Sequence, residues 1–451
     1  MRILLINPPY LAGFHQFSLN FPPLGPAYLA AVLREEGHHV SLLDMNVSRL
    51  ESSAAFDGFE LIGLSTDTPR YPRAVSIAAQ AKNRGVPVAM GGPHVSFQAE
   101  ETLTSGSADY VIRGEGEQAM LSLAEHLEGH RDLSDVPGLS YRSNDQVIHN
   151  AFGGYINDVD SLPFPARDLL PMDKYPVKLG GLPSTSVISS RGCPFHCSFC
   201  ASSELFGLKW RPRSPEALLQ EVKELKRRYG LGGIYFMDDN FTLDPDRTIR
   251  FCELLKKEQL ELTWFCFSRI NTILEREDMV ESMAQAGARM IFLGVETPNQ
   301  EALESYGKKL SAEASVQAVE RLRKHGIRPM CSFILGDPSE DKGMMRRTID
   351  FSRQLDPELA QFSLLTPYPG TRLFEEVKDR QLNREWSYYD GLHATIQIDE
   401  IQPSELERLL KKAYVSFYLN PKRIFKRPVE SARYLLSIKH LFNDSLAFGG
   451  T

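Results

Sequence analysis

The sequence predicts an α/β protein with an N-terminal doubly wound parallel sheet, a partial barrel of six β-α units and a helical C-terminal region. Two patterns predict this fold class. Short apolar strands alternate with amphipathic helices over residues 1–130, and the alternation resumes with a longer repeat over residues 181–375. Size agrees, because 451 residues correspond to about three domains of roughly 150 residues. We therefore expect a connector at residues 131–180 and the helical region at residues 376–451.

Five strands and four helices are expected in the first domain. The strands are residues 2–6, 40–44, 61–65, 87–90 and 110–113, and the helices lie near residues 25–36, 72–84, 97–104 and 117–127. Ligands of such sheets bind outside the carboxyl ends of the strands. Gly91 and Gly92 directly follow a strand, where they would let a bulky ligand approach the backbone closely.

The connector is expected to hold a β-hairpin, formed by residues 139–141 and 147–149. Beyond it, six strands with helices between them predict an open version of the eight-fold barrel, whose working face lies at the carboxyl ends of its strands. These strands are residues 185–189, 233–237, 262–269, 290–295, 329–335 and 361–365.

Composition and charge exclude several classes of protein. Hydrophobic residues make up 42% and charged residues 24%, as in ordinary globular proteins. No apolar run reaches the roughly 18 residues of a membrane span, and no cleavable leader follows the first strand, so we expect a cytoplasmic protein. The net charge of −7 argues against general nucleic-acid binding. Six cysteines are too few for a disulfide-rich secreted scaffold.

Three of the six cysteines follow the first barrel strand with the spacing C-x3-C-x2-C, as Cys193, Cys197 and Cys200. Three thiolates on a short loop suit an iron–sulfur cube that normally takes four cysteines, which leaves one iron open for a substrate or cofactor. The alternative is a zinc knuckle in which His196 is the fourth ligand. The other cysteines, Cys252, Cys266 and Cys331, are expected in the core unless a strand directs Cys266 or Cys331 into the barrel.

The cysteine motif and its place after a barrel strand resemble the radical S-adenosylmethionine (SAM) enzymes, and the N-terminal sheet resembles the cobalamin-dependent subfamily. The resemblance implies a [4Fe-4S] cluster held by the three motif cysteines, with SAM on the open iron and Phe199 against the adenine. In this family an electron from the cluster cleaves SAM to methionine and a 5'-deoxyadenosyl radical.

Further SAM contacts are expected at successive strand ends. Asp239, with Asp238 in reserve, is the candidate acceptor for the amino group of SAM, where the family usually has a Gly-Gly-Glu-like element. These acids would alternatively cap the following turn. Ser268 and Arg269 would hold ribose and carboxylate, and Glu296 would bind ribose hydroxyls. For these three residues an ordinary rim contact or salt bridge is nearly as good an explanation.

Cobalamin-binding sheets often carry Asp-x-His-x-x-Gly after the first strand, whereas this chain has Asn-Pro-Pro-Tyr-Leu-Ala over residues 7–12. His15 and His94 do not match the offset of that histidine. The resemblance therefore implies cobalamin without a histidine ligand. Its expected contacts lie at three strand ends and are Ser65, Thr66, Gly91, Gly92, Arg113, Gly114 and Glu115.

The leading hypothesis is a cobalamin-dependent radical SAM methyltransferase that acts on an unactivated carbon of a small-molecule or lipid-like substrate. A second enzyme hypothesis keeps both cofactors but performs cyclisation, oxidation or rearrangement without methyl transfer. A third is a zinc-stabilised binding protein without turnover. The electron donor would be a small flavodoxin or ferredoxin.

The C-terminal segment predicts a further contact. Residues 401–451 hold nine Lys or Arg and four Asp or Glu, a net charge of +5. Basic residues 422–427 precede a predicted helix bearing Tyr434, Leu435, Ile438 and Phe442, which would suit peripheral contact with an anionic membrane. Packing of one helix face against the body is the alternative.

Overall fold

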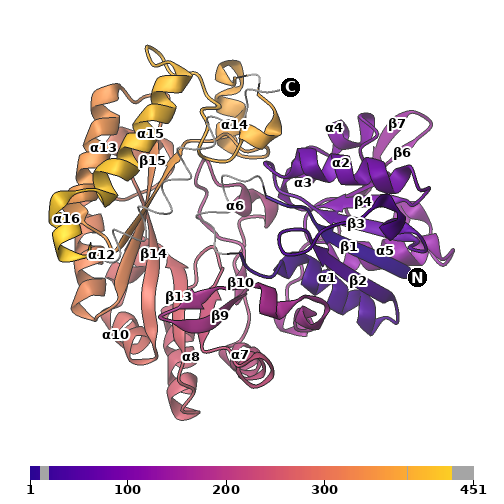
Figure 1. The fold of residues 1–451 in the computed structure, drawn as a ribbon, viewed down its shortest axis with the longest axis horizontal. Helices are drawn as coiled ribbons and strands as arrows, with labels where there is room; N and C mark the ends of the chain where they lie inside the picture. Colours follow the sequence, from indigo (N-terminus) through magenta and orange to yellow (C-terminus); the bar gives the residue numbers. More distant parts are fainter. Residues whose placement is uncertain (11–19, 383, 429–451) are drawn as a thin grey trace.

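Two sheets, each in its own half of the molecule, lie side by side in the computed structural model, which describes residues 1–10, 20–382 and 384–428 (Figure 1). The first has strand order β2-β1-β3-β4-β5-β6-β7, and the second has order β16-β15-β14-β13-β12-β9-β8. A two-stranded ribbon, β10-β11, lies between the halves (Figure 1). The predicted α/β fold class is confirmed.

The N-terminal half is a doubly wound sheet in which the first five strands are parallel. These are β1 (Arg2–Asn7), β2 (His39–Asp44), β3 (Leu61–Ser65), β4 (Val88–Gly91) and β5 (Tyr110–Ile112). Alternate residues of β1 show how both faces are buried: Ile3 and Leu5 pack with α1 (Leu24–Glu35) and α5 (Glu117–Leu127). The other face packs against α2 (Tyr71–Lys82), α3 (Pro93–Phe97) and α4 (Ala99–Thr104).

The predicted hairpin is present, but it extends the first sheet and is not a separate connector. Its strands are β6 (Leu139–Ser143) and β7 (Gln146–His149), and β6 pairs antiparallel with β5. The sheet therefore has seven strands where the sequence pattern showed five. Periodicity identified the hairpin, but only the backbone hydrogen bonds decide which edge it joins.

The second sheet contains the six predicted barrel strands, all parallel. They are β9 (Leu182–Val187), β12 (Gly233–Phe236), β13 (Thr263–Ser268), β14 (Ala288–Glu296), β15 (Arg328–Leu335) and β16 (Leu359–Leu364). β8 (Lys178–Leu179) pairs antiparallel with β9 and closes one edge. The sheet curls into a partial barrel, with its helices outside (Figure 1).

The helices cover the outer face of the partial barrel and bury a large apolar core. They are α7 (Pro215–Tyr229), α8 (Pro245–Lys257), α9 (Ile270–Glu275), α10 (Glu277–Gln285), α11 (Gln300–Ser305), α12 (Ala312–Lys324) and α13 (Lys342–Leu355). Cys252, Cys266 and Cys331 belong to this outer core. The structure therefore places both strand cysteines away from the barrel interior.

The described part of the C-terminal region, up to residue 428, is only partly helical. It contains α14 (Arg372–Glu376), α15 (Pro403–Tyr418) and α16 (Pro421–Lys426), with isolated bridges and 3-10 turns before α15. α15 packs on the edge strand β16, where Tyr414 and Tyr418 exchange hydrogen bonds with its backbone. The predicted tail helix with Tyr434, Leu435, Ile438 and Phe442 lies outside the described residues, as does His15. Among the described helices, none is both long and apolar enough to cross a membrane.

Candidate active site at the carboxyl edge of the partial barrel

The loop with the three motif cysteines lies directly beyond β9, at the carboxyl edge of the barrel sheet. It is enclosed at its base by the antiparallel ribbon of β10 (Ser190–Arg191) and β11 (Arg211–Pro212), and it leads into α6 (Ala201–Leu205). Gly192 has a φ of +81°, and a Cβ atom there would collide with the carbonyl oxygen of Lys209. The loop therefore needs glycine at this position.

The cysteine sulfurs receive donors that suit an iron–sulfur cluster. The backbone N–H of Phe195 donates to Cys193, and the N–H groups of Ser202 and Ser203 donate to Cys200. Arg269 Nη1 lies 3.5 Å from Cys197 Sγ. Burial raises the pKa of the Cys193 thiol to about 11, so its thiolate would need a positive partner such as iron. Hydrogen bonds to sulfur are among the features that tune such clusters.

The two acids after β12 have different surroundings. Asp238 is 2% exposed and accepts hydrogen bonds from the backbone N–H of Ser189 (2.6 Å) and Ser190 (2.9 Å), as well as from the Ser189 hydroxyl. It therefore holds the base of the cysteine loop. Asp239 is exposed, and Ser202 donates to it at 2.6 Å. Of the two, Asp239 is the acid that a ligand can reach.

The two predicted contacts after β13, Ser268 and Arg269, also differ in their surroundings. Ser268 is buried in a cluster of hydroxyls, 2.6 Å from Thr242 Oγ1 and 3.1 Å from Thr272 Oγ1. Arg269 stays half-exposed and places its guanidinium 3.8 Å from the centre of the Phe195 ring, beside the cysteine loop. Arg269 therefore faces the cysteine loop, while Ser268 supports the strand end from within.

Glu296 lies at a β-bulge, where the register between β14 and β15 shifts. Its φ is +64°, and its buried carboxylate forms an ion pair with Lys308 and accepts a 2.8 Å hydrogen bond from Ser332. Lys308 Nζ also lies 5.9 Å from the centre of the Phe199 ring. The bulge thus turns Glu296 toward the same edge as the cysteine loop.

The expected cobalamin contacts are mostly engaged within the protein. A Cβ on Gly92 would lie 2.5 Å from the Thr66 carbonyl oxygen, so this glycine serves the packing of two strand ends. Thr66 Oγ1 donates to the Asp67 carbonyl oxygen. Ser65 is half-buried, and the nearest atom to a Cβ on Gly91 would be 3.9 Å away. Ser65 and Gly91 are therefore the candidates with room for a ligand.

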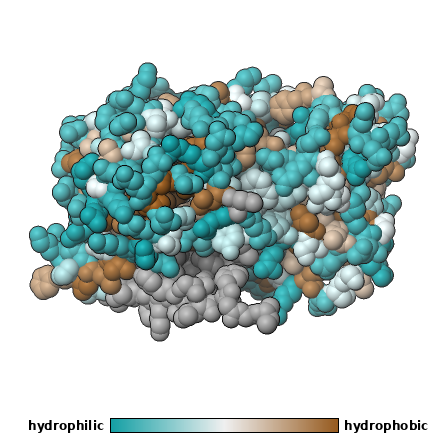
Figure 2. Space-filling view, turned by 90° about the horizontal axis from the view of Figure 1, so that it is seen from above, coloured by the Kyte–Doolittle hydropathy of each residue, from teal (hydrophilic) through white to brown (hydrophobic). Residues whose placement is uncertain are grey.

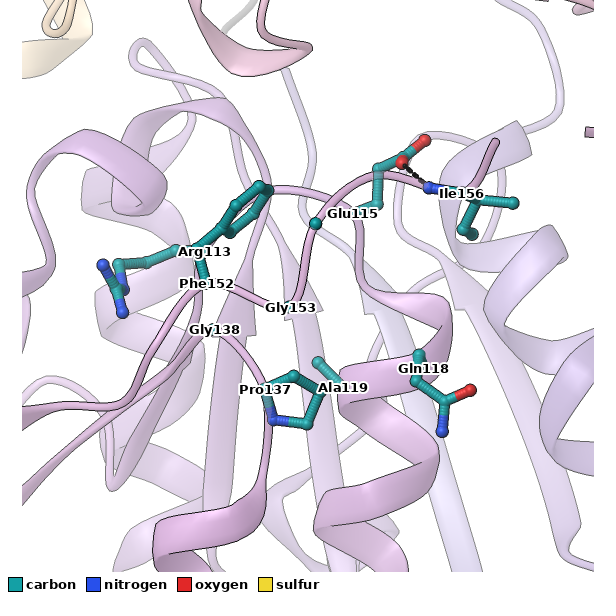
Figure 3. Close-up of a pocket in the computed structure, with 10 residues that line it drawn as sticks. Arg113, Glu115, Gln118, Ala119, Pro137, Gly138, Phe152, Gly153 and Ile156 are labelled. Carbon is teal, nitrogen blue, oxygen red and sulfur yellow. Dashed lines mark hydrogen bonds between the residues drawn. The ribbon is translucent and has the colours of Figure 1, made fainter. Parts of the chain in front are cut away.

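The turn after β5 lines a shallow pocket next to the hairpin and the connector (Figure 3). The Arg113 guanidinium points out of the pocket and donates to the Asn150 carbonyl oxygen at 2.5 Å (Figure 3). The Phe152 ring occupies the space that a Cβ on Gly114 would need. Glu115 accepts a 2.8 Å hydrogen bond from Ile156 N, so its carboxylate faces the connector (Figure 3).

The end of β1 takes part in a cluster of polar side chains. Many cobalamin-binding sheets carry their histidine in the segment that follows this strand. Asn7 donates to Asp44 at 2.9 Å and accepts from Arg70 at 2.6 Å, and Tyr175 donates to Asp44 at 2.8 Å. His94 is elsewhere and buried, with its ring 4.3 Å from that of Tyr71. Burial lowers the pKa of His94 to about 3, which suits a packing role.

Comparison with known proteins decides the family. The radical SAM superfamily matches residues 187–352, and the B12 binding domain family matches residues 12–124. An uncharacterised methyltransferase of Pyrococcus horikoshii is 37% identical over 97% of this chain and 96% of its own. This chain belongs to the radical SAM superfamily, in the group with a B12-binding domain.

Other relatives of this radical SAM protein differ in chemistry. The anaerobic magnesium-protoporphyrin IX monomethyl ester cyclase of Rubrivivax gelatinosus is 28% identical over 99% of this chain and 83% of its own. The methyltransferase TsrM of Kitasatospora setae, solved with cobalamin and a [4Fe-4S] cluster, has a TM-score of 0.71 at 20% identity over 84% of this chain and 78% of its own. The apo form of the cobalamin-dependent enzyme OxsB has a TM-score of 0.76 at 21% identity over 97% and 72% of the two chains.

Family membership overturns the zinc-knuckle alternative, and the geometry agrees. His196 is half-exposed and forms a 2.6 Å ion pair with Glu204, so it does not complete a site with the cysteines. The cofactors of this radical SAM protein are a [4Fe-4S] cluster, SAM and cobalamin.

Two residues at the site were not predicted from the sequence. Lys308 neutralises Glu296, but it is separated from β14 by a helix and has no motif around it. Arg191 lies two residues before Cys193, and this position could have marked it as part of the site. Its acidic partners, however, are far away in the sequence. The Lys308 contact depends on packing within the barrel half, and the Arg191 contacts depend on how the two halves meet.

Proposed function

We propose that Cys193, Cys197 and Cys200 hold the cluster and that the protein transfers a methyl group from cobalamin to an unactivated carbon of an apolar small molecule. The observation that supports it most directly is the loop of three thiols at the carboxyl edge of the barrel sheet, with backbone N–H groups directed at two of the sulfurs. When bound, the cluster supplies the electron that cleaves SAM, and cobalamin carries the methyl group.

The protein's own side chains would bind and orient SAM. We assign the amino group to Asp239 and the carboxylate to Arg269, because both side chains stay accessible beside the loop. Phe199, edge-on to Tyr306 at 5.2 Å, offers an apolar surface for the adenine. Glu296, fixed by Lys308 and Ser332, accepts from ribose hydroxyls. Ser268 and Asp238 hold the strand ends beneath them.

The inner face of the barrel sheet supports an apolar substrate. Aromatic rings follow one another along β13 and across to its neighbours, with centroids 5.2 Å apart for Tyr235 and Phe265, 5.1 Å for Phe265 and Phe267, and 4.9 Å for Phe267 and Phe292. Phe267, Phe292 and Met330 are only half-buried, so they keep surface for a ligand. Seen from above, apolar side chains line a recess on the barrel half (Figure 2).

The first test uses the full chain, reconstituted anaerobically with iron, sulfide and cobalamin and reduced by dithionite. Cys193→Ala, Cys197→Ala and Cys200→Ala should each lose most of the roughly four irons per chain of a [4Fe-4S] cluster and form no 5'-deoxyadenosine from SAM. Cys266→Ala and Cys331→Ala are matched controls in the outer core and should keep both properties. Full iron content in any loop variant would contradict the assignment.

Methyl transfer is separated from its alternative by product mass. With SAM carrying a deuterated methyl group and an apolar extract of the source cells, methylation adds one labelled methyl to a product. Cyclisation, which the relative from Rubrivivax makes the second candidate, adds none.

All six cysteines are free thiols, as expected in a reducing compartment. In that compartment we expect reduced flavodoxin or ferredoxin to replace dithionite as the electron donor.

We also propose that α16 touches an anionic membrane. Phe425 is 90% exposed and Ile424 is 38% exposed, between the exposed Lys422 and Lys426. Arg423 turns the other way, donating to the Asp356 carboxylate at 2.8 Å. Phe425→Ser with Lys422→Gln and Lys426→Gln should reduce co-sedimentation with phosphatidylserine vesicles. Lys256→Gln with Lys257→Gln on α8 is the charge control, and equal loss in both would reject the proposal.

A further inference from the structure

The ribbon at the base of the cysteine loop brings two arginines together. Arg191 on β10 is the direct antiparallel partner of Arg211 on β11. Like charges directly opposite each other destabilise a strand pair unless other groups neutralise them. Both residues are buried, at 8% and 6% exposure, so water does not screen their repulsion. The pair therefore needs acidic partners.

Those partners come from the other half of the molecule, from the turn between β5 and α5 and from the first residue of α5. Glu115 binds both arginines: Arg191 Nη1 lies 2.7 Å from Oε1, and Arg211 Nη1 lies 2.7 Å from Oε2. Glu117 binds the second terminal nitrogen of the Arg191 guanidinium, with Arg191 Nη2 2.6 Å from Glu117 Oε1. Arg211 also donates to the Ile156 carbonyl oxygen at 2.6 Å. Two positive and two negative side chains thus balance.

The arrangement depends on the two terminal nitrogens of the Arg191 guanidinium, each of which pairs with a different glutamate. One guanidinium reaches two separate carboxylates at once, which the single ammonium of lysine does not reproduce. Burial opposes the ionisation of Glu115, but hydrogen bonds from Arg211 and Arg191 outweigh burial and lower its pKa. Glu115 therefore stays ionised near neutral pH, where its charge-assisted hydrogen bonds to the two arginines are short and directional.

A shift of Arg191 would be passed on to the cysteine loop. Only Gly192 separates Arg191 from Cys193, and the backbone at Gly192 is wedged against the Lys209 carbonyl and the Phe206 side chain. From the barrel side, Asp238 holds Ser189 and Ser190, and Arg247 donates to the Ser189 carbonyl oxygen at 2.8 Å. The start of the loop is thus tied to both halves.

We propose that Glu115, Glu117, Arg191 and Arg211 form a clamp that sets the position of the cysteine loop relative to the N-terminal domain. Since the proposed function places one cofactor on each side of this junction, the inference rests on that function. The clamp residues are positioning residues, because they are buried and paired with one another. This role also replaces the expectation that Glu115 contacts cobalamin.

The test measures the magnetic interaction between the reduced cluster and cob(II)alamin by electron spin resonance in the reconstituted full chain. Glu115→Gln, Arg191→Lys and the double variant should keep iron and cobalamin but change this interaction by about twofold or more, because it depends steeply on separation. The double variant should change it no more than either single variant, since one network is broken in each case. Asp356→Asn, which removes the negative charge beside the buried Arg423 far from the junction, is the control and should leave the spectrum unchanged.

An unaltered interaction in folded, fully loaded variants would overturn the clamp, and so would additive effects in the double variant. If Glu115→Gln fails to fold, Glu117→Gln replaces it, because Arg191 then keeps Glu115. A wild type that binds no cobalamin or makes no 5'-deoxyadenosine would instead reject the proposed function. The two failures are therefore distinguishable.

Discussion

Neighbouring residues of one type take opposite roles at the carboxyl end of β12. Asp238 and Asp239 are adjacent in a loop, so their side chains point in different directions and meet different surroundings. One is enclosed by the backbone of the cysteine loop, and the other is open to solvent beside Ser202. The sequence predicted an acid for SAM at this point, with Asp239 first.

This division predicts a contrast between two conservative variants. Asp239→Asn should raise the Kd for SAM about tenfold or more, through loss of a charge-assisted bond, and leave the Tm nearly unchanged. Asp238→Asn should lower stability by about 1–3 kcal/mol, because a neutral amide with one acceptor oxygen replaces a carboxylate whose two oxygens accept three hydrogen bonds. Calorimetric titration of the reconstituted protein and thermal unfolding measure the two effects. Unchanged SAM affinity in Asp239→Asn would count against the assignment.

At the scale of elements, the loop between β15 and α13 contains a buried acidic residue, Glu340. Glu340 is 3% exposed, and its Oε2 accepts from the backbone N–H groups of Gly336 (3.0 Å) and Asp337 (3.3 Å). Burial raises its pKa to about 7 despite these donors. The carboxyl thus closes the strand end by hydrogen bonding to its backbone.

The raised pKa of Glu340 predicts a pH-dependent stability. Because the folded protein holds this proton more tightly than the unfolded chain, the contribution is complete below about pH 4.5 and is lost as pH rises toward 7, a change of about 3 kcal/mol. Urea unfolding of the apo protein at pH 5 and pH 7.5 should therefore show a smaller loss with rising pH in Glu340→Gln than in the wild type. His94, with its lowered pKa, has the opposite dependence in both proteins, so the difference between them is the quantity to compare. Parallel pH profiles would contradict the prediction.

At the scale of the whole molecule, buried ion pairs join the halves. Next to the clamp, Glu221 of α7 pairs with Arg167 of the connector at 2.7 Å and with Arg213, and Arg167 also donates to the Ser186 carbonyl oxygen at 2.9 Å. All three charged side chains are at most 3% exposed. The connector is thereby fixed against the barrel.

Removal of the central acid should be costly. Glu221→Gln leaves two arginines buried with reduced neutralisation, and we expect a loss of about 3–5 kcal/mol in the free energy of unfolding. Glu224→Gln on the same helix removes a partly exposed i,i+4 pair with Arg228 at 3.7 Å and should change stability by less than about 1 kcal/mol. Denaturant unfolding compares the two. Equal losses in the free energy of unfolding would show that the buried network stabilises the fold no more than the exposed pair does.

Much of the architecture follows from the sequence. Alternation of apolar strands with amphipathic helices is a local property, so both sheets, the hairpin and all six barrel strands could be placed within a few residues. The cysteine loop and the acid at Asp239 were also predictable, because motif spacing and position after a strand are readable along the chain. The assignments of the three loop cysteines and of Asp239 stay predictions until the variants are measured.

Tertiary structure decided what each side chain faces. The direction of Cys266 and Cys331, the burial of Ser268, and the space left at Gly91 but not at Gly92 depend on sheet curl and on which backbone approaches. Glu115 shows this most clearly: its sequence position suggested a ligand contact, and its partners lie in β10 and β11 of the other half. Pattern along a chain reports local periodicity, whereas pairing between distant charges is set only when the two halves pack together.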